Sequence, residues 1–192
     1  AWESNNILAS LLCARAELAA GFFFSYSDIV YAPQVTAALA NAPALGDAAL
    51  IVDRRWRDAY EGRTLHPVSE AELARVDQPG TRVTRVGKRL VAEDDAAGEF
   101  IGLARVSAAG AERLLRVWDR AVESRGLDGP FGNAKQLRNA YLTDALNAMI
   151  DEGGNLAPVF IDGTWREVDT GQDLANAERV LPQWMPDALR VS

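Results

Sequence analysis

Two stretches of the chain decide its fold class: FFFSYSD at residues 22–28 and AALIVD at residues 48–53. Each is a short, continuous apolar run of strand length that ends on an acidic residue. Runs of this kind are typical of strands buried on both faces of a sheet. Helical patterns lie between and after them, with Pro33 placed to begin one helix and Ser107 to cap another. This alternation predicts an α/β sheet covered by helices on both faces.

The rest of the chain supplies further elements of the same kind. Residues 82–88 alternate polar and apolar side chains, which predicts a half-exposed strand, and residues 156–161 predict another. Helices are expected after an N-cap at Ser4, along the apolar stripe of residues 137–149, and at residues 173–181. We see no internal repeat or flexible linker. We therefore expect a single domain over residues 1–192, with an inserted arm at residues 54–98.

Composition restricts the classes of function. The 192 residues carry a net charge of -7, which argues against a broad nucleic-acid or anionic-membrane surface. No apolar run reaches the length of a membrane span. The single cysteine, Cys13, indicates a reducing cytoplasm and is expected to be a buried, inert thiol. Because His66 is the lone histidine, we expect no histidine-based metal site; any metal should be hard and oxygen-ligated.

Three acidic residues stand at or just beyond the ends of predicted strands: Asp28, Asp53 and Asp169. Ligands of open α/β sheets gather at the carboxyl ends of strands. Two carboxylates that converge from separate strands can hold Mg²⁺, which takes one or two carboxylates together with substrate phosphates. The alternative is that each aspartate serves a turn or a helix cap, where this residue is common.

Four other side chains could take part in binding. Lys88 follows a glycine at a strand end, where it could neutralise phosphate charge or simply be solvated. Glu99 could accept hydrogen bonds from a substrate hydroxyl or amine, or lie on an edge strand. Tyr141 and Asp144 share a helix face. We expect Tyr141 to face the core, and Asp144 either to reach a cavity or to lie on a solvated helix edge.

A basic cluster follows the second acidic strand end. Arg54, Arg55 and Arg63 could attract an acidic substrate, or form salt bridges with Asp58 and Glu61. The sequence contains no Gly-rich phosphate loop, no G-x-S-x-G elbow and no Cys/His pair.

Five runs that appear in order along the chain resemble a known family. They are residues 5–7 (NNI), 25–30 (SYSDIV), 98–103 (GEFIGL), 140–144 (AYLTD) and 165–170 (WREVDT). Together they resemble the sugar-phosphate nucleotidyltransferase superfamily over nearly the whole chain. Within it, the likeness is to small-molecule cytidylyltransferases that act on phosphonates or phosphocholine, including the domain fused to some phosphoenolpyruvate phosphomutases.

The resemblance implies a GT-A-like, Rossmann-related mixed sheet and a transfer of a nucleoside monophosphate, CMP from CTP, to a small phosphonate or phosphate acceptor. Pyrophosphate is released. Asp28 and Asp169 would hold Mg²⁺, and Lys88 would contact a phosphoryl group. Glu99, Tyr141 and Asp144 would shape the acceptor pocket, and we add Asp53 to the substrate-binding set. Phosphoryl transfer needs positioning and charge neutralisation more than a nucleophilic side chain, so the lack of Ser/His or Cys/His machinery is expected.

The chain departs from the family at its first residues. Members begin with a strand and a Gly-rich loop that carries Arg and Lys, and no such βαβ unit precedes the Asn5-Asn6 segment here. The chain could be a fragment, could receive its nucleotide half from elsewhere, or could have lost catalysis. The loss of that unit should expose strand edges, so we expect weak stability or a homo-oligomer.

Two other functions stay open at this point. The first is a non-catalytic α/β module that binds a ligand or partner. The second is a GT-A glycosyltransferase, which would normally want a D-x-D pair at a strand end, whereas residues 27–30 (SDIV) offer one acid.

Overall fold

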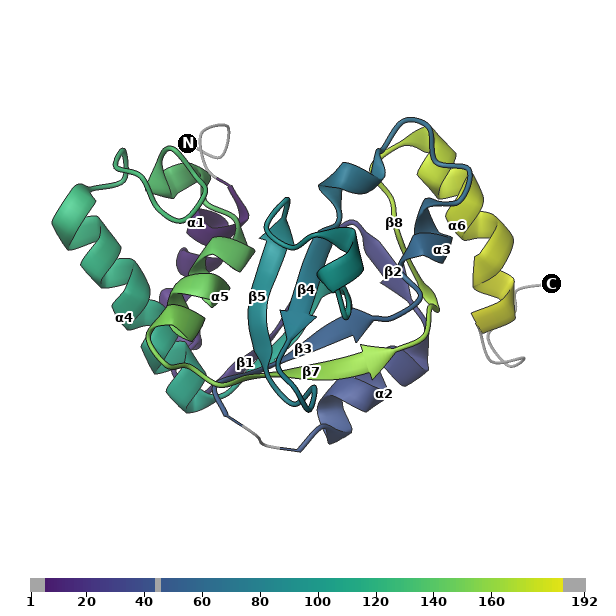
Figure 1. Cartoon of the computed structure of the whole chain (residues 1–192). Helices are drawn as coiled ribbons and strands as arrows, with labels where there is room; N and C mark the ends of the chain where they lie inside the picture. Colours follow the sequence, from purple (N-terminus) through teal and green to yellow (C-terminus); the bar gives the residue numbers. More distant parts are fainter. Residues whose placement is uncertain (1–5, 44–45, 185–192) are drawn as a thin grey trace.

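The computed structural model describes residues 6–43 and 46–184. Its centre is a six-stranded mixed sheet (Figure 1). The strand order is β5 (Val83–Lys88), β4 (Glu72–Val76), β6 (Gly98–Val106), β3 (Ala48–Asp53) and β7 (Leu156–Ile161), with β1 (Phe22–Ser25) also paired to β6. Strands β3 and β7 run parallel, and the other pairs are antiparallel. A separate two-stranded sheet joins β2 (Ile29–Tyr31) to β8 (Trp165–Glu167).

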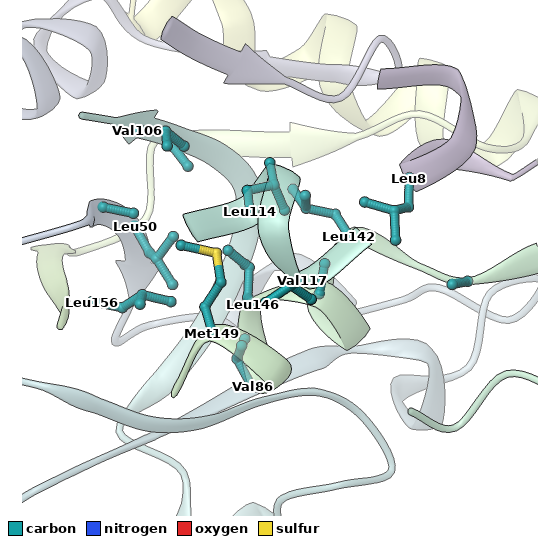
Figure 2. Packing of buried hydrophobic residues seen from close by; sticks show 14 of the residues in the cluster. Leu8, Leu50, Val86, Val106, Leu114, Val117, Leu142, Leu146, Met149 and Leu156 are labelled. Atoms are coloured by element: carbon teal, nitrogen blue, oxygen red, sulfur yellow. The ribbon is translucent and has the colours of Figure 1, made fainter. Parts of the chain in front are cut away.

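Helices cover both faces of the large sheet, as predicted. Along β3, Leu50 and Val52 belong to one hydrophobic cluster, whereas Ala49 and Ile51 belong to the other. The first cluster packs under α1 (Ile7–Leu12), α4 (Ala108–Arg125) and α5 (Leu142–Asp151), and Figure 2 shows its interdigitating aliphatic side chains. On the second face lies α2 (Pro33–Asn41), which contacts β3, β6 and β7. The remaining helical pieces are α3 (Arg57–Tyr60), α6 (Gly171–Trp184) and the short 3-10 turns η2 (Arg15–Glu17), η3 (Val68–Glu70), η4 (Glu93–Asp95) and η5 (Leu137–Asn139).

Local sequence chemistry explains where the helices begin. The Ser107 hydroxyl accepts a hydrogen bond from Gly110 N at 3.0 Å and caps α4, and Pro33 occupies the first turn of α2; both predictions are confirmed. Helix α1 begins after Asn6, whose Oδ1 accepts from Ile7 N at 2.8 Å; the expected cap, Ser4, lies outside the described residues. The stripe at residues 137–149 is divided, because η5 precedes α5.

Two expectations from the sequence are wrong. Residues 54–98 do not form an inserted arm, because they include β4 and β5, and β4 pairs with β6 in the main sheet. Cys13 is exposed rather than buried, since α1 ends at Leu12 and turns this side chain outward. Among the described residues, no helix is long and apolar enough to cross a membrane.

An irregularity in β6 positions the turn that carries Asp28. The pairing of β6 with β3 shifts between Leu50 and Val52, and Gly102 within the shifted stretch has φ 79°. A β-carbon at Gly102 would collide with the ring of Tyr26. Glycine is therefore required at this position for two reasons: the positive φ of its backbone and the close approach of the Tyr26 ring. The result is that Tyr26 lies against β6 and holds the β1–β2 turn over the sheet.

Candidate active site

A cavity of about 350 Å³ opens where β1 and β5 end and β4 and β6 begin. Its walls come from seven separate parts of the chain. The lining residues are Asn6, Ile7, Tyr26, Ser27, Asp28, His66, Glu70, Glu72, Lys88, Glu99, Phe100, Ile101, Tyr141, Trp165, Glu167 and Asp169. Five of the seven side chains proposed from the sequence are among them: Asp28, Lys88, Glu99, Tyr141 and Asp169. The fold thus gathers most of the proposed site at one place.

Asp53 and Asp144 lie outside this cavity, and their carboxylates accept hydrogen bonds mainly from backbone amides. Asp53 is buried, and its carboxylate accepts hydrogen bonds from Arg55 N (2.9 Å), Gly163 N (2.7 Å) and Trp165 Nε1 (2.7 Å). Asp144 accepts from Tyr141 N and Asn133 N, both at 2.9 Å, and so caps the start of α5. Because all four oxygens are occupied, the proposed substrate-binding roles of these two residues have no structural support.

The small sheet brings Asp28 and Asp169 together. Ile29 of β2 lies opposite Glu167 of β8, and Val168 N donates to the carbonyl of Asp28 at 2.7 Å. Asp28 supplies the accepting carbonyl and Asp169 follows Val168 directly, so the two aspartates lie on adjacent segments although they are far apart in sequence. Asp169 lies just beyond β8, and Asp28 ends the turn between β1 and β2. Their convergence depends on the register of a ladder with three residues in each strand.

His66 is a neighbour of Asp169 that sequence reasoning missed. Its Nδ1 lies 2.7 Å from Asp169 Oδ2, and its Nε2 lies 3.5 Å from Glu167 Oε2. Ligand atoms of His66, Glu167 and Asp169 lie within 4.8 Å of one another; Asp28 lines the same cavity but is not in this group. The lone histidine therefore belongs to a cluster of metal-ligand type, contrary to expectation. Residues 61–67 have no periodic pattern that could have placed it there.

Arg63 forms ion pairs with the acidic residues of β8 and the segment that follows it. Its side chain is only 3% exposed; Nε lies 2.7 Å from Asp173 Oδ1, and Nη2 lies 3.5 Å from Glu167 Oε2 and 3.8 Å from Asp169 Oδ2. The guanidinium also lies over the ring of Tyr60, 5.1 Å from its centroid. Among the predicted arginine pairs, Arg55 does bind Asp58, but Arg63 reaches this buried cluster instead of Glu61.

Two carboxylates that line the cavity have strongly raised pKa values. Burial raises the pKa of Glu99 to about 8, against the effect of the hydrogen bond that it accepts from the Tyr60 hydroxyl at 2.7 Å. Burial, together with the negative charge of Asp169, raises the pKa of Glu167 to about 7. Such raised values indicate acids for which nearby protein groups do not fully compensate the loss of water. Perturbed carboxylates of this kind concentrate at functional sites.

Glu72 is better satisfied than its neighbours in the cavity. Its Oε2 accepts from the Tyr26 hydroxyl at 2.7 Å and its Oε1 from Thr143 Oγ1 at 2.9 Å. Burial still raises the pKa of Glu72, and these two hydrogen bonds oppose that effect.

Lys88 is the only lysine or arginine that lines the cavity in the described part of the chain. Its Nζ lies 3.4 Å from Glu70 Oε2 and 5.2 Å from the centroid of the Tyr141 ring. Burial lowers the pKa of Lys88, but the charges of Glu72 and Glu70 outweigh it and raise the pKa above its ordinary value, so the amine stays charged. Tyr141 is 41% exposed and faces this ammonium rather than the core, so the prediction that it is core-facing is wrong.

The fold is shared with solved nucleotidyltransferases. The structure of the inositol-1-phosphate CTP transferase from T. maritima superposes with a TM-score of 0.67 at 16% identity, covering 98% of this chain and 65% of that one. That of the CTP:phosphocholine cytidylyltransferase from Streptococcus pneumoniae gives a TM-score of 0.61 at 18% identity, with 94% and 65% covered. The chain thus has the mixed α/β fold of the nucleotidyltransferases.

A curated sequence relative refines this class. The CTP:phosphoglutamine cytidylyltransferase of Campylobacter jejuni is 27% identical over 179 residues, which are 90% of this chain and 67% of that protein. No model of a protein family matches the chain. The resemblance to nucleotidyltransferases, and within them to cytidylyltransferases, is confirmed. The chain spans 65% of the length of each solved structure named above.

Proposed function

We propose that the chain transfers a nucleoside monophosphate, CMP from CTP, to the phosphonate or phosphate oxygen of a small acceptor and releases pyrophosphate. The observation that carries this proposal is the convergence of Asp28, Asp169 and Lys88 in one cavity. Two acids and one cation, without a nucleophile beside a base, fit a reaction that depends on charge neutralisation and positioning. The sequence relationship to a cytidylyltransferase supports CTP as the donor. A non-catalytic binding module is not favoured, since the relatives named above are transferases.

The residues present fit Mg²⁺. Asp28 and Asp169 would hold the ion through carboxylate oxygens, with Glu167 beside them. Oxygen ligands and remaining sites for water and phosphate are what Mg²⁺ prefers. His66, 2.7 Å from Asp169, would orient that carboxylate from outside the ligand set. When bound, the ion supplies positive charge to the phosphate groups of the nucleotide.

The chain's own residues then act on charge and orientation. The Lys88 ammonium binds a phosphoryl oxygen, and Tyr141 limits the positions that this amine can take because the ammonium lies over its ring. The acceptor needs no general base, because phosphate and phosphonate monoanions or dianions dominate at neutral pH. The oxygen of the acceptor attacks the α-phosphorus of the donor, a phosphorus–oxygen bond forms, and the bond to the pyrophosphate oxygen breaks. The chain holds the two reactants in line.

Pyrophosphate release, measured with CTP, Mg²⁺ and a phosphonate or phosphate acceptor, tests this function. We expect Asp28→Asn and Asp169→Asn each to reduce the rate by at least about 100-fold, the size of effect seen when one electrostatic contact to a transition state is lost. Asp151→Asn, at an exposed aspartate that pairs with Arg85 on another surface, is the matched control and should retain the wild-type rate. Wild-type rates in both Asp28→Asn and Asp169→Asn would refute the metal assignment.

A further inference from the structure

Glu72 lines the cavity but has no role in the proposed reaction. It is the first residue of β4 and is 5% exposed. In the antiparallel pairing of β4 with β5, it lies directly opposite Lys88. Residues opposite each other in such a pair project from the same face of the sheet. The carboxylate of Glu72 and the ammonium of Lys88 are therefore neighbours in the wall of the cavity.

Two hydrogen bonds join Glu72 to the segments that carry other site residues. Its Oε2 accepts from the Tyr26 hydroxyl at 2.7 Å, and Asp28 follows Tyr26 in the turn between β1 and β2. Its Oε1 accepts from Thr143 Oγ1 at 2.9 Å, and Thr143 follows Tyr141 at the start of α5. One carboxylate thus links the segment of Asp28 to the segment of Tyr141.

Close packing fixes both donors. A β-carbon at Gly102 would come within 2.2 Å of the Tyr26 ring, so this ring lies directly against β6. Thr143 is 4% exposed, and a β-carbon at Gly87 of β5 would lie 3.2 Å from its Oγ1. Because neither donor has room to move, their hydrogen bonds hold the Glu72 carboxylate in one orientation.

The charge of Glu72 acts on Lys88. Burial lowers the pKa of Lys88, and the charge of Glu72 is the largest of the effects that raise it instead. Glu70 forms an ion pair with the same ammonium at 3.4 Å, but Glu70 also binds Arg89 and is more exposed than Glu72. Glu72 is therefore the buried and fixed one of the two counter-charges of Lys88.

We infer that Glu72 is a positioning residue of the proposed reaction: its carboxylate holds Lys88 in place and fixes the turn that presents Asp28. It acts through these two residues rather than on the substrate, because Tyr26 and Thr143 donate to both of its oxygens. The inference rests on the proposed function for the roles of Lys88 and Asp28. The alternative is that Glu72 serves the fold alone, and the measurements below distinguish the two.

Glu72→Gln removes the charge and keeps the shape. The amide oxygen can accept from the Tyr26 hydroxyl, and the amide nitrogen can donate to Thr143 Oγ1, because a hydroxyl both donates and accepts. We therefore expect a folded variant, which urea unfolding verifies. Glu123→Gln removes a carboxylate from the exposed surface of α4 and is the matched control.

Lysine labelling measures the hold on Lys88 without any turnover. The sequence contains two lysines, Lys88 and Lys135, so exposed Lys135 is an internal reference. Acetic anhydride at low occupancy reacts with the uncharged amine, and peptide mass spectrometry separates the two products. Glu72→Gln should raise the labelling rate of Lys88 relative to Lys135 by at least about 3-fold, because a neighbouring carboxylate raises a lysine pKa by about one unit or more. Glu123→Gln should leave this ratio at its wild-type value.

Mn²⁺ binding measures the link to Asp28. Tyr26→Phe removes the hydrogen bond to Glu72 and keeps the ring. Electron paramagnetic resonance of free Mn²⁺ in the presence of CTP should show about 3- to 10-fold weaker binding, the effect of losing support outside the ligand set. Tyr31→Phe removes a hydroxyl from β2 at a residue that does not line the cavity, and it should bind Mn²⁺ like the wild type.

Pyrophosphate release adds a kinetic signature that a purely structural role would not give. Glu72→Gln should lower kcat by about 10- to 100-fold, the cost of a misplaced group, with the KM for CTP within about 3-fold of wild type. Unchanged Lys88 labelling in folded Glu72→Gln overturns the hold on Lys88. Unchanged Mn²⁺ binding in folded Tyr26→Phe overturns the link to Asp28.

These outcomes separate the inference from the proposed function. Pyrophosphate release by the wild type, with neither the labelling effect nor the Mn²⁺ effect in the variants, refutes the inference and leaves the proposed function standing. Both effects in a chain that releases no pyrophosphate refute the proposed function, and the positioning of Lys88 and Asp28 by Glu72 stands.

Discussion

The chain buries acids in two kinds of place, and the difference between them separates structure from function. At the end of β3 and the start of α5, Asp53 and Asp144 accept hydrogen bonds through every oxygen, and their partners are mostly backbone amides. In the cavity, Glu99 keeps a buried oxygen without a partner and has its pKa raised to about 8. Burial alone therefore does not mark a site. Burial with incomplete compensation does.

Stability as a function of pH should show the largest contrast between these acids. The pKa of Glu99 rises from 4.5 in the unfolded chain to about 8 in the folded one, so the folded state binds more protons in between. The stability linked to this proton is full below about pH 4.5 and is lost as pH rises through 8, by at most about 5 kcal/mol. Glu99→Gln should flatten this part of the pH profile of the urea unfolding free energy. An identical slope in wild type and Glu99→Gln would mean that Glu99 is compensated in the fold.

That contrast could not have been read from the sequence. FFFSYSD, AALIVD and WREVDT each place an acid at or after an extended segment, and nothing local separates Asp53 from Asp28 and Asp169. The separation comes from tertiary contacts: Trp165 Nε1 and Gly163 N reach Asp53, whereas the β2–β8 ladder brings Asp28 and Asp169 to the cavity.

The sequence did predict the regular strands and helices, from their residue patterns, and most of the cavity residues, from the family resemblance. Continuous apolar runs and periodic patterns located β3, β5, β7 and α4, and resemblance placed five side chains that line the cavity. The contacts of His66 and Tyr60 were missed, and Arg63 was predicted with other partners. These residues lie in or beside an irregular segment, where side-chain direction depends on packing against β6, β8 and α6. The irregular pattern of residues 54–98 also led to the prediction of an inserted arm, whereas β4 within this stretch pairs with β6 of the main sheet.

Removal of a structural acid should destabilise the fold outright. Asp53→Ala leaves three donors without their acceptor, including the buried Trp165 indole N–H, and should lower the urea unfolding free energy by about 4 kcal/mol. Glu99→Gln at pH 7 should not lower it and should raise it by up to about 3 kcal/mol, since the wild-type glutamate must take up a proton on folding at this pH and glutamine does not. Comparable losses in both variants would remove the distinction drawn here.

Arg63 lies between the two kinds of acid, because it binds structural Asp173 and approaches Asp169 of the site. Arg63→Met leaves the buried Asp173 carboxylate without its cation and should cost about 3 kcal/mol in urea unfolding. It should also weaken Mn²⁺ binding at Asp169 by about 10-fold, the effect of losing support outside the ligand set. Stability loss with unchanged metal binding would make Arg63 a purely structural residue.

The smallest effect is expected at the start of α5. Asp144→Ala removes two hydrogen bonds to backbone amides at a helix N-terminus and should cost about 2 kcal/mol in thermal or urea unfolding. The affinity for a small phosphonate acceptor, measured by calorimetry, should not change, since Asp144 does not line the cavity. A folded Asp144→Ala variant with weakened acceptor binding would restore this residue to the site.

Electron paramagnetic resonance of Mn²⁺, with Mn²⁺ in place of Mg²⁺, tests the central claim most directly, because it counts free ions and needs no turnover. The account predicts that wild-type protein and the surface control Asp151→Asn bind Mn²⁺ equally in the presence of CTP. Asp169→Asn should weaken that binding by at least about 10-fold, because it removes one charged ligand from a site with few others. Undiminished Mn²⁺ binding by folded Asp169→Asn would contradict the account, since the cavity would then not be the place where the chain holds its metal.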